Sequence, residues 1–244
     1  MGRVEKELFV QLRDVKLFTK IYGQKKDKPT VVMDAGYGDY SKSWDQVVTE
    51  VSQLTEVVVY DRAGLGRSEK SRNRRTSQEM VKELKELLTI LNVDTPIILV
   101  GHSFGGINIR LFATKYPDDV AGLLLVDSTP EEYKERFLPI MSNEFQVAYH
   151  QQFIHESNYD EFMESLRTVG ENKTTLDIPL MVLCAGKKDH YTVEAQELWN
   201  EMQAELVGIS TNGQLVIANE SGHFIQKDEP NIVIDAIKRL VKDA

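Results

Sequence analysis

The sequence Gly101-His102-Ser103-Phe104-Gly105 fits the pattern G-x-S-x-G, and the rest of the chain can be read outward from it. An apolar run at 97–100 precedes it, and an apolar pattern typical of a helix continues after it to position 112. A strand that turns at once into a helix strains the central residue, so the residues two before and two after it must be small. We therefore predict a sharp turn that exposes Ser103 at the end of a strand.

Short apolar, β-branched runs alternate with helical patterns on both sides of this turn. The runs predict strands that are covered on both faces, and the alternation predicts a doubly wound, mostly parallel α/β sheet. Residues 7–13 and 15–22 alternate apolar and polar positions and predict an antiparallel hairpin at the sheet edge. The remaining strands are expected at 30–34, 56–60, 96–100, 120–126, 178–185 and 214–218, and the helices at 43–54, 77–91, 104–116, 193–206 and 231–241.

The interval 128–176 breaks this alternation, because about 48 residues separate two strands there. Its aromatic and charged pattern favours helices. The chain has no internal repeat and no Pro/Gly-rich linker. We expect one domain over residues 1–244, with 128–176 as a helical cap inserted after the sixth strand.

The composition limits the classes of partner. The formal net charge of −9 argues against general affinity for nucleic acid or anionic membranes. No apolar run approaches the roughly 18 residues of a membrane helix, and residues 1–10 lack the apolar core of a secretory signal. We expect a cytoplasmic protein without a membrane span, and a monomer by default. The single cysteine, Cys184, is expected to be a buried apolar side chain.

A serine hydroxyl needs a base to become a nucleophile at neutral pH, and the chain offers five histidines. His102 adjoins Ser103 but points elsewhere on so sharp a turn, and two histidines fall in the interval 128–176. His190 adjoins a candidate acid. His223 follows the last predicted strand, where a loop reaches the same carboxyl edge as Ser103. We predict His223 as the base.

The base needs an acid that holds its imidazole in the correct tautomer, and two aspartates compete for this role. Asp127 ends one predicted strand, and Asp189 lies on a turn after the next strand. Both reach the same edge, and both preserve the order Ser, Asp, His. We favour Asp189, because its turn comes one strand before the His223 loop, and we keep Asp127 as the alternative.

Five motifs lie along the chain in this order: Asp34-Ala35-Gly36-Tyr37-Gly38, Asp61-Arg62-Ala63-Gly64-Leu65-Gly66-Arg67-Ser68, residues 101–106, residues 186–189 and Ser221-Gly222-His223-Phe224. Together they resemble the motifs of the α/β-hydrolase superfamily over nearly the whole chain, on the serine-nucleophile branch with a helical cap found among esterases and lipases. The resemblance implies an eight-stranded, mostly parallel sheet, and it implies Ser103 as nucleophile, Asp189 as acid and His223 as base.

One motif departs from many relatives, which carry His-Gly where this chain has Ala35-Gly36. By position, the backbone N–H groups of Tyr37 and Phe104 are expected to form the oxyanion hole, which needs no particular side chain. Asp61 and Arg62 are interpreted as residues that hold loops in place. The expected reaction is acyl transfer through Ser103, which requires no metal and no organic cofactor.

The substrate is less constrained by the sequence, because the cap and the loops beneath it shape the pocket. The expected substrate is a small or medium apolar ester, and aromatic residues of the interval 128–176 are candidates to line its pocket or to pack against the main domain. Alternatives are an amide, a lactone or a carbon–carbon bond. A different class is a ligand-binding signalling protein that retains the triad and turns over slowly.

Overall fold

One sheet of eight strands runs through the protein, seen here in a computed structural model that describes residues 4–244. Residues 1–3, at the start of the charged N-terminal stretch, lie outside the described residues. The strands lie in the order β1-β2-β4-β3-β5-β6-β7-β8. They are β1 (Val4–Gln11), β2 (Lys16–Tyr22), β3 (Val31–Asp34), β4 (Val57–Tyr60), β5 (Ile97–His102), β6 (Val120–Val126), β7 (Leu176–Ala185) and β8 (Ser210–Ala218).

Most of this sheet is parallel, as the sequence predicted. The hairpin β1–β2 and the β2–β4 pair are antiparallel, and every pair from β4 to β8 is parallel. β5 lies between β3 and β6, and Gly101 pairs with Asp34 on one side and Leu125 on the other. The end of β5 is therefore flanked by the ends of two parallel strands, where ligand sites of open α/β sheets form.

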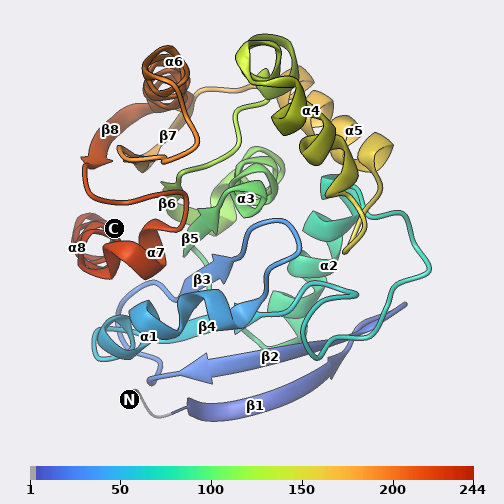
Figure 1. The fold of residues 1–244 in the computed structure, drawn as a ribbon. Coiled ribbons are helices and arrows are strands. Elements are labelled where there is room, and N and C mark those ends of the chain that lie inside the picture. Colours follow the sequence, from blue (N-terminus) through green and yellow to red (C-terminus); the bar gives the residue numbers. More distant parts are fainter. Residues whose placement is uncertain (1–3) are drawn as a thin grey trace.

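Helices cover both faces of the sheet (Figure 1). α1 and α8 pack together on one face, whereas α2, α3 and α6 contribute to the apolar core on the other. Among residues 4–244, no helix is long and apolar enough to cross a membrane. The helices are α1 (Asp45–Val51), α2 (Ser77–Ile90), α3 (Phe104–Lys115), α4 (Asn143–Gln151), α5 (Tyr159–Glu171), α6 (Val193–Glu205), α7 (Ile225–Asp228) and α8 (Pro230–Asp243), with short turns at Ser41–Trp44, Pro117–Asp119, Tyr133–Phe137, Leu138–Ile140 and Leu206–Ile209.

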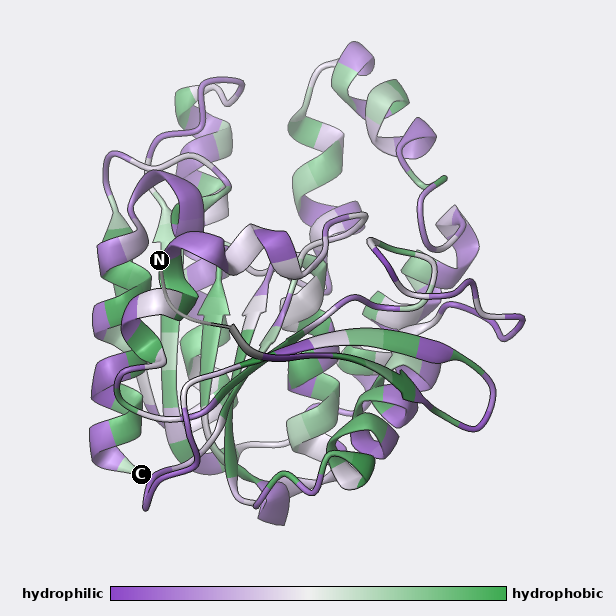
Figure 2. Ribbon diagram, turned by 90° about the horizontal axis from the view of Figure 1, so that it is seen from below, coloured by the Kyte–Doolittle hydropathy of each residue, from purple (hydrophilic) through white to green (hydrophobic). Residues whose placement is uncertain are grey.

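The central strands are fully buried, because helices cover both of their faces. All residues of β3, β4 and β5 are buried, and Figure 2 shows the hydrophobic colours along the central strands while the outer helices alternate in colour. On α2, Met80, Leu84 and Leu87 share one buried stripe. Each fully buried side chain of this size stabilises the fold by about 1.5–3 kcal/mol, so the sheet is a rigid support for its carboxyl edge.

The segment between β6 and β7, called the insertion here (residues 127–175), carries α4 and α5. A capping box begins α5: Asn158 accepts from the N–H of Glu161, and the Glu161 carboxylate accepts from the N–H of Asn158. Its apolar residues Phe162, Leu166 and Val169 are buried, and α5 packs against α2 and α3. The insertion therefore shares the core of the sheet domain.

Candidate active site

Ser103 lies in the turn between β5 and α3, with φ 52° and ψ −117°. This left-handed conformation is costly for a residue with a side chain and is typical of functional turns. A Cβ atom on Gly101 would lie 2.6 Å from the carbonyl oxygen of Gly105, and one on Gly105 would overlap the backbone of Asp34. The two glycines are therefore required by the close packing of this turn, and Ser103 is only partly buried.

His223 lies in the loop after β8, and its imidazole is held by a carboxylate. Its Nδ1 lies 2.6 Å from Oδ2 of Asp127, the residue that directly follows β6. The Asp127 side chain is fully buried, whereas the His223 side chain is 37% exposed. His223 and Ser103 both line the same cavity. Such a hydrogen bond fixes Nδ1 as the protonated nitrogen and leaves Nε2 free to act as a base.

Asp127 is saturated with donors. Its Oδ1 accepts hydrogen bonds from Trp199 Nε1 (2.8 Å) and from the N–H of Ala185 (3.0 Å), and its Oδ2 also contacts Lys188 Nζ at 2.7 Å. Burial alone would raise the pKa of Asp127, but the charge of Lys188 and the hydrogen bond from His223 outweigh it and hold that pKa below its usual range. Asp127 is therefore an anion at neutral pH.

The expectation that Asp189 orients His223 is corrected by this geometry, because Asp127 occupies the position beside Nδ1. Asp189 is exposed and lies at the rim of the cavity. Its neighbour Lys188 turns inward instead. A carboxylate at the end of a buried strand needs partners, and Asp127 finds them in His223, Lys188 and Trp199.

Arg62 and Glu156 hold the loop after β3 in place through hydrogen bonds to its backbone. The Arg62 guanidinium donates to the carbonyl oxygens of Ala35 (2.6 Å) and Gly36 (2.7 Å) and pairs with Asp34 and Glu156. Glu156, in the insertion, also accepts from the N–H of Gly38 at 2.9 Å. These contacts support the interpretation of Arg62 as a residue that holds the loop in place.

Two backbone N–H groups are available where an oxyanion hole is expected. Within residues 4–244, the N–H groups of Tyr37 and Phe104 take part in no hydrogen bond. Phe104 begins α3, so its N–H lies at the positive end of the helix dipole. The Tyr37 hydroxyl donates to the carbonyl oxygen of Ser157 at 2.6 Å, which ties this side chain to the insertion. Both N–H groups can therefore donate to a bound ligand.

His102 has a supporting role in the geometry. It is buried, and its Nε2 donates to the carbonyl oxygen of His223 at 2.9 Å. Burial lowers the pKa of His102 well below its usual value, and the nearby His223 adds to this effect. His102 is therefore neutral, and it fixes the backbone of the loop that carries His223.

A cavity of about 680 Å³ opens over Ser103 and His223. The interval 128–176 contains seven Phe and Tyr residues, which divide between the two expected roles. Five of them line this cavity, while Phe137 and Tyr159 pack behind it. Tyr133 stacks on Tyr149 with ring centroids 5.0 Å apart. The lining of the cavity is therefore largely aromatic, and its aromatic residues form one wall: Tyr133, Phe145, Tyr149, Phe153, Phe162, Tyr37, Tyr191, Trp199 and Phe224.

No candidate metal site is present among residues 4–244, because no group of three or more His, Cys, Asp or Glu residues is arranged there to hold a metal ion. Cys184 is buried in β7, and burial raises its pKa to about 12. Its thiol therefore stays protonated at neutral pH.

Comparison with known proteins identifies the family to which this fold belongs. Residues 29–146 match the family model described as "alpha/beta hydrolase fold". The chain is 32% identical over 210 residues to "Uncharacterized protein YqjL" of Bacillus subtilis (strain 168), covering 85% of this chain and 81% of that protein. The chain belongs to the α/β-hydrolase family.

Other relatives of this α/β hydrolase carry different descriptions. "Epoxide hydrolase 4" of Mus musculus is 22% identical over 286 residues, covering 96% of this chain and 79% of that protein. The structure of a "putative lipase (lip1)" from Acinetobacter baumannii AYE superposes with a TM-score of 0.71 at 19% identity, covering 98% of this chain and 91% of that chain. At this identity the superposition establishes the shared fold alone.

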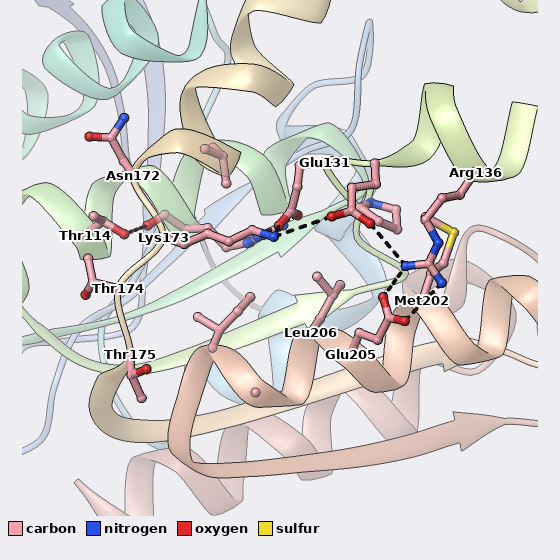
Figure 3. A pocket seen from close by; sticks show the side chains of 16 residues that line it. Thr114, Glu131, Arg136, Asn172, Lys173, Thr174, Thr175, Met202, Glu205 and Leu206 are labelled. Atoms are coloured by element: carbon pink, nitrogen blue, oxygen red, sulfur yellow. Dashed lines mark hydrogen bonds and ion pairs between the residues drawn. The ribbon is translucent and has the colours of Figure 1, made fainter.

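The hydrolase has a second cavity, of about 330 Å³, between α3, α6 and the end of α5. Figure 3 shows Lys173, Glu131, Arg136 and Glu205 turned toward one another across it. Glu131 pairs with Arg110 and Lys173 at 2.7 Å each. Burial raises the pKa of Glu131, but the charge of Arg110 and the hydrogen bonds from Lys173 and Arg110 together outweigh it and lower that pKa to about 2. This second cavity is therefore bordered by a network of paired charges.

Sequence reasoning missed three side chains that shape the candidate active site of this hydrolase. Lys188 and Trp199 contact Asp127, and Glu156 contacts the loop after β3. Each reaches its partner from a distant part of the chain, and no local pattern marks Trp199 or Glu156. For Lys188, the signal available was a lysine at the carboxyl end of an apolar strand, next to the candidate acid.

Proposed function

We propose that this hydrolase cleaves a carboxylic ester through an acyl-enzyme on Ser103, with His223 as base and Asp127 as the acid that orients it. The observation that carries the proposal is the 2.6 Å contact between His223 Nδ1 and the buried Asp127 carboxylate, at the cavity that Ser103 lines. Burying a carboxylate costs desolvation free energy even when four donors surround it, so a buried ion pair adds little net stability. Orienting an imidazole is a functional role that accounts for this carboxylate.

The first half of the reaction forms the acyl-enzyme. Oγ of Ser103 attacks the ester carbonyl while His223 Nε2 takes the hydroxyl proton, and Asp127 stabilises the resulting imidazolium. The tetrahedral intermediate collapses when His223 gives this proton to the leaving alcohol. Among residues 4–244, the Ser103 hydroxyl makes no hydrogen bond, and contacts of this kind often tighten when substrate binds.

The oxyanion of the tetrahedral intermediate would be stabilised by the N–H groups of Tyr37 and Phe104. Their lack of partners supports this role, because preorganised donors cost little to reorganise during the reaction. Arg62 and Glu156 hold the loop after β3, which carries Tyr37, through hydrogen bonds to the backbone of Gly36 and Gly38. In the second half, His223 removes a proton from water, which attacks the acyl group, and His223 then gives this proton to Oγ of Ser103 as the acid is released.

The substrate class follows from the cavity. Its volume of about 680 Å³ and its aromatic wall suit an apolar acyl group of small or medium size. Most of this wall comes from residues 133–162, so we propose that the insertion acts as a cap that selects the substrate. We also propose a monomer, since neither the triad nor the cavity needs a second chain for its completion.

The proposal is tested by turnover of p-nitrophenyl esters of increasing acyl length, with mass spectrometry after a fluorophosphonate probe. The expected result is saturable turnover and an adduct on Ser103, both lost in Ser103→Ala. The loss of turnover should be about 10⁶-fold, the scale on which subtilisin depends on its nucleophilic serine. No adduct on Ser103 would overturn the nucleophile. An adduct without ester turnover would reject the ester and favour an amide, a lactone or a carbon–carbon bond.

A further inference from the structure

Lys188 is a buried cation beside the proposed acid. It follows β7, its side chain is 7% exposed, and its Nζ lies 2.7 Å from Oδ2 of Asp127. The Nζ also lies 3.3 Å from the centre of the Trp199 ring, which covers it as a cation–π partner. Lysine is rarely buried unless it is paired, and here its ionic partner is Asp127.

His223 and Lys188 share one oxygen atom of Asp127. Oδ2 contacts His223 Nδ1 at 2.6 Å and Lys188 Nζ at 2.7 Å, while Oδ1 accepts from Trp199 and the backbone. In a triad without such a lysine, the whole charge of the aspartate stabilises the protonated histidine. In this protein a second cation already neutralises that charge, so the protonated imidazole gains less from it.

We propose that Lys188 sets the lower pH limit of catalysis, by keeping His223 unprotonated where Asp127 alone would hold it protonated. This inference rests on the proposed function, since it concerns the same base. Lys188 acts through Asp127 and is therefore a positioning residue. Its position fits such a role, because a charge one oxygen atom away from the imidazole acts through little solvent.

Other charged or titratable groups near His223 do not replace this effect. The His102 ring lies 4.7 Å from the His223 ring, but burial lowers the pKa of His102 and keeps it neutral. From α7, Asp228 accepts from the N–H of Gly222 at 3.0 Å and Lys227 pairs with Asp39 at 3.4 Å. Both are exposed, so solvent screens their charges. Among residues 4–244, Asp127 and Lys188 are the buried charges that face the imidazole.

The test compares Lys188→Met with the wild type in two pH profiles: the rate of fluorophosphonate labelling of Ser103, and kcat/KM for a p-nitrophenyl ester. Loss of a positive charge favours the protonated imidazole, so activity should be lost at higher pH. Two charges on the order of 4–5 Å apart predict that the acidic limb moves up by about one pH unit or more.

Two further variants separate charge from packing. Lys188→Arg keeps the charge, so its acidic limb should stay at the wild-type pH. Lys187→Met removes the same charge from the neighbouring residue, whose side chain is 60% exposed, and its limb should move by less than about 0.3 unit because solvent screens an exposed charge.

An unmoved acidic limb in Lys188→Met, with activity lowered equally at every pH, would overturn the inference and leave the lysine a packing role. Absence of labelling in the wild type would instead overturn the proposed function, and the inference with it. If the variant does not fold, ¹⁵N NMR of lysine-labelled wild type decides: Lys188 Nζ must stay protonated through the acidic limb, and a neutral amine there would contradict the proposal.

Discussion

The carboxylates of Asp127 and Asp189 follow neighbouring strands at the same edge of the sheet, yet their surroundings differ. Asp127 is fully buried and contacts His223, Lys188 and Trp199, whereas Asp189 is exposed at the rim of the cavity. Topology brings both to the edge, but burial and a full set of donors distinguish the group that can orient a base. An exposed carboxylate lacks that fixed geometry, because water competes for it.

The largest effect is expected at the histidine that contacts Asp127. His223→Gln should lower kcat by about 10⁵–10⁶-fold, since the loss of the base removes the function of the whole triad. His190 adjoins Asp189, is exposed and lines the same cavity. Steady-state ester hydrolysis by His190→Gln serves as the matched control and should stay within about threefold of the wild type. A large loss of activity in His190→Gln would instead indicate His190, next to Asp189, as the base.

A second buried carboxylate, Glu156, extends the comparison to the loop after β3. Glu156→Gln should lower kcat by about 10–100-fold with little change in KM, because it loosens the Tyr37 N–H and not the substrate pocket. The control is Glu164→Gln, whose partner Arg74 is exposed. Affinity for a trifluoromethyl ketone should fall in parallel with kcat/KM, and a rise in KM alone would contradict the role assigned to Glu156.

A third paired carboxylate, Glu131, lies outside the active site and should affect stability alone. Glu131→Gln should lower the free energy of unfolding by about 2 kcal/mol at pH 7, because it leaves Arg110 buried without its partner. Glu132→Gln, in which the lost carboxylate is half exposed, should cost less than about 0.5 kcal/mol. Urea unfolding measures both, and an equal loss in the two variants would contradict the burial argument.

The same pair gives a pH dependence of stability. The pKa of Glu131 is about 2 in the folded protein, below its ordinary value of 4.5, so its contribution is present above that ordinary value. It is lost as the pH falls through 4.5 toward 2. The stability difference between wild type and Glu131→Gln should therefore be smaller at low pH than at pH 7, and a difference that grows on acidification would contradict this account.

The smallest effect is expected from a single donor to Asp127. Trp199→Phe removes the Nε1–H that Oδ1 accepts at 2.8 Å but keeps an apolar ring beneath Lys188. Three donors remain on the carboxylate, so kcat/KM should fall by about 3–10-fold. An unchanged kcat/KM would mean that Asp127 is oriented without the indole.

The sequence predicted much of the fold, because the signals are local. The buried run before Ser103 and the glycines around it define the central strand and turn, and His223 could be placed from its loop after the last strand. The acid could not be chosen in this way. Asp127 and Asp189 reach the same edge, and the choice depends on whether Lys188 turns inward, which is a property of tertiary packing.

The most direct test of the account is kcat/KM for one p-nitrophenyl ester in Asp127→Asn and Asp189→Asn, with folding checked by circular dichroism. The account predicts a loss of about 10³–10⁴-fold in Asp127→Asn, the scale on which serine proteases depend on the charge of the triad aspartate. Asp189→Asn should stay within about threefold of the wild type. A large loss in Asp189→Asn with near-normal activity in Asp127→Asn would contradict it.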